Sequence, residues 1–161
     1  MDYDDYKQYL LGIRHKYGSD VGLTWEKAHC APKPDLFGEL VGWTLTWAGV
    51  FPDQHFLRVR EDWAIEAHES QRNFFSYHYG PYEEGWDLTG VRPKSVIVRV
   101  DAQDYSGLGY HIHDRHKNRR IYQVQLTAPV LADMKIGEFV ESVLNLRKGK
   151  PLQEAFGLVF R

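Results

Sequence analysis

The sequence predicts a single α+β domain in which an antiparallel, strongly curved sheet of about five strands carries an N-terminal helix and a C-terminal helix on one face. Three observations support this prediction. The length of 161 residues fits one domain with one core. Amphipathic helical patterns stand near both ends of the chain. Between them, segments rich in aromatic and β-branched residues alternate with turn-forming sequences, which is typical of an antiparallel meander.

The first part of the chain, residues 1–38, is predicted to form a helix and a long connection. We expect the helix over residues 2–17, ending at Gly18. From Gly18 to Gly38 the sequence contains Pro32 and Pro34 and has little periodicity, so a surface connection or a mobile arm is expected. The apolar residues that define the helix follow one another at intervals of three and four: Tyr3, Tyr6, Leu10, Ile13 and Tyr17.

The middle part, residues 39–127, is predicted to form the meander with a histidine-rich segment. Turns are expected at Pro52-Asp53 and at Glu69 to Arg72. Gly80 to Pro93 contains several glycines and prolines, so we expect a flexible loop that covers a site. The expected strands are Leu40 to Phe51, His55 to His68, Asn73 to Tyr79, Ser95 to Asp101 and Arg120 to Leu126.

The last part, residues 131–161, is predicted to form a helix and an apolar tail. Asp133 is expected to cap the helix, and Gly149 to end it. The tail begins at Pro151 and is too apolar to stay in water, so it should dock on the core or on a partner. The apolar face of the helix consists of Ile136, Phe139, Val140, Val143 and Leu144.

Composition limits the function classes. Twenty Lys and Arg residues against 22 Asp and Glu residues give a net charge of -2, so any phosphate contact has to be local. The single cysteine, Cys30, cannot form an internal disulfide, which favours a cytoplasmic protein. No secretory leader, membrane span, glycine-rich phosphate loop or serine-hydrolase elbow is found, so we expect no membrane contact and no cofactor.

The segment from His111 to His116 is the most informative part of the sequence. It holds three imidazoles, one carboxylate and one guanidinium. Because His111 and His113 are two residues apart in an extended segment, their rings are expected to point the same way. Such a pair can act as general acid and base, or can bind a metal together with His116. A histidine-rich surface loop with neither role is the remaining interpretation.

Strand alternation predicts a polar face on the sheet. If the valine and leucine faces meet the helices, five polar residues share the opposite side. Arg99 is also explained by a surface ion pair with Asp101 or Glu61, and His78 by a half-buried hydrogen bond. The residues expected on the polar face are Arg58, Arg60, His78, Arg99 and Asp101.

Four short motifs in order resemble the TumE-like toxins of bacterial and archaeal toxin–antitoxin pairs. These are FLRVRE at residues 56–61, FFSYHYG at 74–80, VIVRVD at 96–101 and YHIHDRHK at 110–117. The resemblance covers roughly residues 40–146. It implies a small cytoplasmic toxin that acts on RNA and is bound by a cognate antitoxin. The family pattern has Asn after the strand aspartate and a His-His-x-His cluster, whereas this chain has Ala102 and the spacing His111, His113, His116.

Together these observations predict a metal-independent RNA endonuclease. His111 and His113 are expected to form the acid–base pair, with His78 as alternate base or orienter. A non-catalytic protein-binding module and a metal site of His111, His113 and His116 are the alternatives, and a homodimer stays open. The residues expected to bind substrate are Arg99, Arg115, Arg58, Arg60 and Asp101, with Tyr77, Tyr79 and Tyr110 stacking on unpaired bases.

Overall fold

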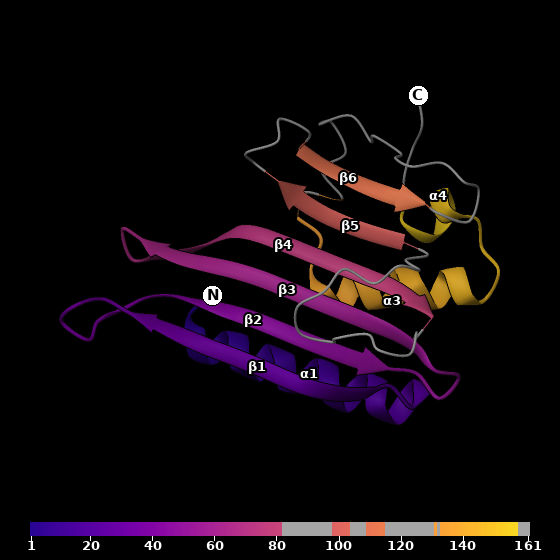
Figure 1. Cartoon of the computed structure of the whole chain (residues 1–161), viewed down its shortest axis with the longest axis horizontal. Coiled ribbons are helices and arrows are strands. Elements are labelled where there is room, and N and C mark those ends of the chain that lie inside the picture. The colour runs from indigo at the N-terminus through magenta and orange to yellow at the C-terminus, as the bar shows by residue number, and fades with distance from the viewer. Residues whose placement is uncertain (82–97, 104–108, 115–130, 132, 158–161) are drawn as a thin grey trace.

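The fold is α+β, as predicted, with an open antiparallel sheet of six strands in the order β1-β2-β3-β4-β5-β6 (Figure 1). This computed structural model describes residues 1–81, 98–103, 109–114, 131 and 133–157, and the account below concerns these residues. The elements are α1 (Tyr3–Val21), β1 (Thr24–Pro34), β2 (Leu40–Val50), β3 (His55–Glu66), β4 (Glu69–Pro81), β5 (Val98–Gln103), β6 (Gly109–Asp114), α3 (Ile136–Arg147) and α4 (Leu152–Ala155).

Helix α1 is one turn longer than the sequence predicts. Asp2 caps its first turn by accepting a hydrogen bond from the backbone N–H of Asp5 at 2.8 Å. The helix continues through Gly18 and ends at Gly22, which adopts a left-handed conformation with φ of 68°. Gly18 weakens a helix but does not end it unless the backbone turns left-handed there, and this chain makes that turn at Gly22.

Strand β1 replaces the surface connection expected between Gly18 and Gly38. It pairs with β2 over most of its length, with register shifts between Glu26 and His29 and between Lys33 and Pro34. Prolines such as Pro32 and Pro34 argue against a central strand, because they cannot donate to the ladder. Among the described strands β1 stands at the edge of the sheet, where proline is tolerated.

Two tight turns connect β2 to β4. The turn at Pro52-Asp53 lies where the sequence predicts it, closed by a 2.8 Å hydrogen bond from the N–H of Phe51 to the carbonyl of His55. The turn expected at Glu69 to Arg72 is instead made by Ala67 and His68, with φ values of 49° and 67°, and β4 begins directly after it. Two successive left-handed residues match the twist of a hairpin. Such turns usually contain glycine or asparagine, and this one contains neither, so the sequence does not indicate it.

The C-terminal helices follow the prediction in position but not in capping. The N-cap of α3 is Lys135 and not Asp133, and the Glu138 carboxylate accepts the backbone N–H of Lys135 at 2.8 Å. Phe156, in the expected docking tail, is buried with its ring centroid 6.1 Å from that of Phe139. The loop expected between Gly80 and Pro93 lies outside the described residues after Pro81, as do the strand expected at 120–126 and the tail beyond Gly157.

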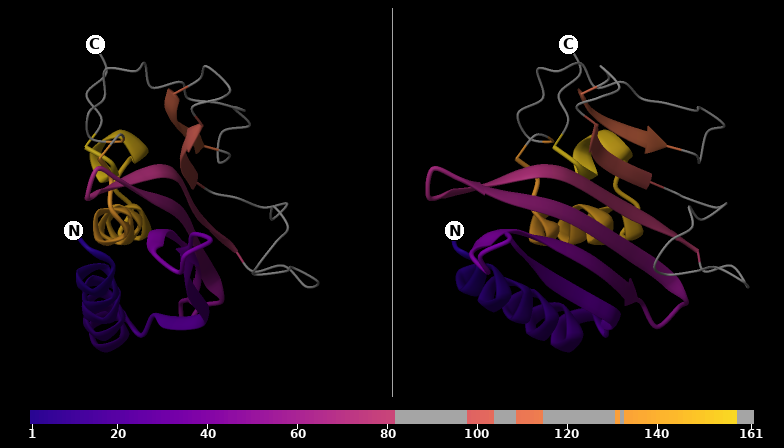
Figure 2. Two further views of the ribbon diagram at one scale, coloured as in Figure 1. Left: turned by 90° about the vertical axis from the view of Figure 1, so that its left-hand side faces the viewer. Right: turned by 60° about the vertical axis from the view of Figure 1, so that its left-hand side comes forward.

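The two faces of the sheet differ sharply in character. Figure 2 shows α1 and α3 on the same side of the sheet, and the core lies between them and the strands. No helix in the described ranges combines the length and the apolar character needed to cross a bilayer. The buried residues that the central strands turn toward the helices are Trp43, Leu45 and Trp47 of β2, Leu57 and Val59 of β3, Phe75, Tyr77 and Tyr79 of β4, and Val98 and Val100 of β5.

Candidate functional site

The strand register gathers the predicted polar residues into two adjacent rows that cross β3, β4, β5 and β6. Directly paired positions of an antiparallel sheet share a face, so each row belongs to one side. We call the side opposite the helices the polar face. The first row runs Arg58, His78, Arg99 and His113, and the second runs Arg60, Ser76, Asp101 and His111.

An ion pair between Arg99 and Asp101 lies at the centre of the polar face. The sequence predicts this pair as a surface contact, but Asp101 has no exposed area and the Arg99 side chain is only 12% exposed. Glu61, the other partner considered for Arg99, lies on the opposite face. A buried carboxylate needs compensating donors, so Asp101 anchors this part of the face and neutralises one guanidinium.

His78 is also buried, with 5% of its surface exposed. Its Nε2 atom lies 2.9 Å from the hydroxyl oxygen of Ser76, two residues earlier on the same strand. Arg58, which faces His78 across the ladder, is 6% exposed, whereas Arg60 in the next row is exposed. The hydrogen bond holds one imidazole nitrogen and so fixes the ring in place.

The two histidines expected to be catalytic fall into these rows by register. On β6, His111 is the Cα partner of Asp101 and His113 is the Cα partner of Arg99. Arg115 and His116 lie outside the described residues. Among the side chains that the structure describes, no group of three potential metal ligands occurs, and the metal site of His111, His113 and His116 stays a prediction.

Two of the three tyrosines expected to stack on bases, Tyr77 and Tyr79, belong to the helix side of the sheet. Tyr77 is fully buried, and its hydroxyl group donates to the Glu61 carboxylate. Tyr79 is 4% exposed, and its hydroxyl oxygen accepts from Arg147 at 2.9 Å. Tyr110 is the Cα partner of Ala102, which belongs to a core row. The structure therefore does not bring Tyr77 and Tyr79 together with His78 on the polar face, and the buried ring of Tyr77 has no surface to offer a base.

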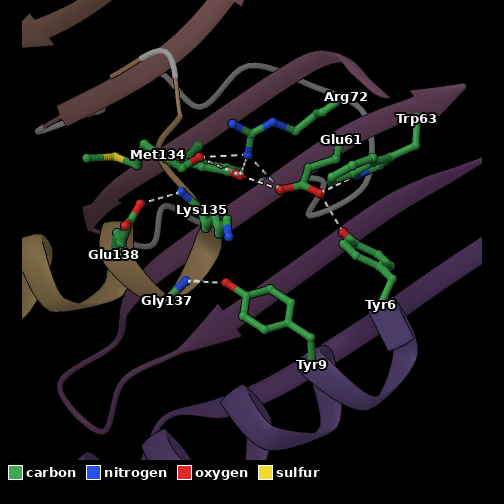
Figure 3. A network of polar contacts seen from close by, with 10 residues as sticks. Tyr6, Tyr9, Glu61, Trp63, Arg72, Met134, Lys135, Gly137 and Glu138 are labelled. Atoms are coloured by element: carbon green, nitrogen blue, oxygen red, sulfur yellow. Dashed lines mark hydrogen bonds and ion pairs between the residues drawn. The ribbon is translucent and has the colours of Figure 1, made fainter. Parts of the chain in front are cut away.

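A second polar cluster, which the sequence analysis missed, surrounds Glu61 on the helix side (Figure 3). The Glu61 side chain is 2% exposed. One carboxylate oxygen accepts from the Tyr6 hydroxyl at 2.5 Å and from the Trp63 indole N–H at 2.7 Å. The other accepts from the Tyr77 hydroxyl and lies 3.4 Å from Arg72. The available signal was an acid at the apolar-face position that follows Leu57 and Val59 in β3.

The Glu61 cluster is suited to structure rather than to proton transfer. A carboxylate offers about four acceptor sites, and here four donors take them, which leaves no site for a substrate proton. Burial and the Glu61 charge raise the pKa of Tyr6 and of Tyr77 far above the ordinary tyrosine value, so both remain protonated. A pocket of about 590 Å³ is lined by four residues of the cluster, namely Tyr6, Glu61, Trp63 and Arg72, together with Tyr9 and Lys135. The Tyr9 hydroxyl accepts from the N–H of Gly137 at 3.0 Å.

No protein-family model, curated protein or solved structure matches the chain. The likeness to the TumE-like toxins therefore stays a prediction from the motifs. The function has to be inferred from the residues and from their positions in the fold.

Proposed function

We propose that the protein is a metal-independent RNA endonuclease that works by histidine acid–base catalysis. The observation that supports this proposal is the strand register, in which positions 111 and 113 are the Cα partners of Asp101 and Arg99, and Arg99 is in turn the Cα partner of His78. As the motif resemblance implies, the nuclease serves as the toxin of a cytoplasmic toxin–antitoxin pair. The cognate antitoxin is then its protein partner.

RNA supplies its own nucleophile, which limits what the protein must provide. One histidine of the pair His111 and His113 takes the proton of the ribose 2′-hydroxyl group while that oxygen attacks the adjacent phosphorus. The P–O bond to the next nucleotide breaks, and the other histidine protonates the departing 5′-oxygen. A 2′,3′-cyclic phosphate remains on the upstream strand. This step needs no metal and no cofactor.

The polar face also carries groups that suit the charge of the reacting phosphate. Guanidinium groups form paired hydrogen bonds with phosphate oxygens, and Arg60, in the second row, is exposed. Arg99, in the first row, is held in a fixed position by its ion pair with Asp101. The hydrogen bond to Ser76 restricts the rotation of the His78 ring, which suits His78 to orient a neighbouring group.

The test compares the double variant His111→Ala, His113→Ala with a matched histidine control. The control variant His15→Ala, His68→Asn removes two imidazoles from the surface of α1 and from the β3–β4 turn, and asparagine tolerates the left-handed conformation of position 68. Cleavage of single-stranded RNA is measured in EDTA, with circular dichroism to verify folding. Loss of both catalytic histidines should lower the rate by at least about 10²-fold, and the control should not. A folded double variant that cleaves as fast as wild type would refute the assignment.

A non-catalytic protein-binding module is the second candidate, favoured by the β1–β2 turn. Leu36 is 100% exposed and Phe37 is 92% exposed at this turn. The turn is held by the Asp35 carboxylate, which accepts the N–H groups of Phe37 and Glu39 at 2.8 and 2.9 Å. Two exposed apolar side chains on a fixed turn are typical of a protein contact. Folded wild-type protein that cleaves no RNA in the same assay would favour this function.

A further inference from the structure

We infer that Phe74 and Arg60 form a stacking platform for an unpaired nucleobase beside the proposed catalytic histidines. The inference rests on the proposed function, because it assigns the polar face an RNA strand as its ligand. It also assigns base stacking to a residue other than Tyr77 and Tyr79, which lie on the helix side. The substrate that follows is single-stranded RNA.

Phe74 lies on the polar face of the sheet. Phe74 precedes Ser76 by two residues on β4, so both side chains lie on the polar face. Its ring is partly exposed. On the described parts of β3, β4 and β5, the other phenylalanine on this face is Phe56, which has no exposed surface. Of these two phenylalanines, Phe74 is therefore the one that a base can reach.

The Arg60 guanidinium group contacts the Phe74 ring. The guanidinium carbon of Arg60 lies 5.7 Å from the centre of the ring. Because Arg60 is exposed, this cation–π contact is weak and gives way easily to a base. A base that stacks on the ring brings its own phosphate close to the guanidinium group, which can then bind it.

Charge around the platform also favours a nucleic acid strand. Asp62 is the Cα partner of Phe74, and its carboxylate is paired with Lys33. The charges of Lys33 and Asp62 cancel, so the three charged residues Lys33, Asp62 and Arg60 together carry one positive charge. The platform is therefore locally positive, although the whole chain is slightly acidic. A local positive charge is what phosphate contact requires in a protein without a basic surface.

The distance between Phe74 and His78 along β4 indicates where the stacked base lies relative to the cleaved bond. Phe74 and His78 are four residues apart on one strand, which corresponds to about 13 Å. The platform therefore holds a base near the cleaved bond rather than at it. Stacking uses the face of a base, which all four bases possess, so we expect little sequence preference and a requirement for an unpaired strand.

The experiment measures binding rather than cleavage. Fluorescence anisotropy with a 2′-O-methyl oligonucleotide, which the proposed reaction cannot cleave, gives the affinity of the full-length protein. Phe74→Leu keeps an apolar side chain but removes the aromatic face, and should weaken binding by about five- to 150-fold, since one stacked base is worth about 1–3 kcal/mol. Phe74→Trp should restore the affinity, and Leu11→Ala serves as the control because that exposed side chain lies on α1, on the other side of the sheet.

The outcomes separate this inference from the proposed function. Equal binding by Phe74→Leu and wild type would overturn the platform, as would tighter binding of a duplex than of the single strand. Absence of oligonucleotide binding by wild-type protein would overturn it as well. Weaker binding by Phe74→Leu with recovery in Phe74→Trp supports the platform even if wild-type protein cleaves no RNA. In that case the catalytic proposal fails alone, and the polar face is an RNA-binding surface.

Discussion

Replacement of Glu61 by glutamine should be among the most destabilising single changes in this fold. The substitution keeps the size of the side chain and removes its charge. One carboxylate oxygen accepts from Tyr6 and Trp63, and the other from Tyr77 and Arg72. Either orientation of the amide therefore turns its NH₂ group toward two donors, and Arg72 loses its counter-charge.

The magnitude follows from burial. The Glu61 and Arg72 side chains are 2% and 11% exposed, so water can replace few of the lost contacts. Removing one partner of a buried pair costs about 3–5 kcal/mol. Tyr6→Phe removes a single donor to the same carboxylate and should cost about 1.5–3 kcal/mol. The two changes share Glu61, so their effects in the double variant should add to less than their sum.

Urea unfolding followed by circular dichroism measures both changes. Glu66→Gln at the exposed end of β3 is the matched control and should shift the free energy of unfolding by less than about 0.5 kcal/mol. If Glu61→Gln were as stable as this control, the carboxylate would not hold the cluster together. Additive effects in the double variant would show that Tyr6 and Glu61 act independently, against the 2.5 Å hydrogen bond.

Two further predictions concern the β3–β4 turn and alkaline pH. Ala67→Asn with His68→Gly should raise the free energy of unfolding by about 1 kcal/mol, because both positions are left-handed; an unchanged urea midpoint would argue against strain there. The pKa of Tyr6 and of Tyr77 is raised from 10.0, so the free energy of unfolding should fall above that pH by up to about 1.4 kcal/mol per pH unit for each tyrosine. Urea unfolding at several pH values measures this slope, and Tyr6→Phe should make it smaller. An unchanged slope in Tyr6→Phe would show that Tyr6 does not contribute to it.

Regular strands and the two-sided character of the sheet could be predicted because their signals are local. Arg58, His78 and Arg99 each alternate with apolar neighbours, and alternation alone assigns them to one face. The chain also alternates Tyr77 and Tyr79 with His78, so the sequence already separated them from the polar face. Their assignment to base stacking followed from residue type and set aside that geometry.

Features that depend on distant residues could not be predicted. Pro32 and Pro34 indicate a loop unless the strand is known to lie at an edge, and only the assembled sheet shows this. Glu61 stands at a core position of β3, but its partner Tyr6 is 55 residues away in α1. A buried acid is tolerated only with such partners, and no local pattern identifies them.

Alternate side chains of strand β4 belong to the core and to the polar face, so both surfaces depend on the same strand register. Tyr77 and Tyr79 contact helix α3 through Phe139 and Arg147, while Ser76 and His78 belong to the proposed RNA face. Deleting one residue near the start of β4 would exchange the two sets at once, turning the tyrosines toward the polar face and the imidazole toward the helices. Homologous chains should therefore vary in length at the hairpin ends and keep an unbroken spacing between positions 74 and 79. Evolution can alter this surface by substitution, but not by insertion or deletion within the strand.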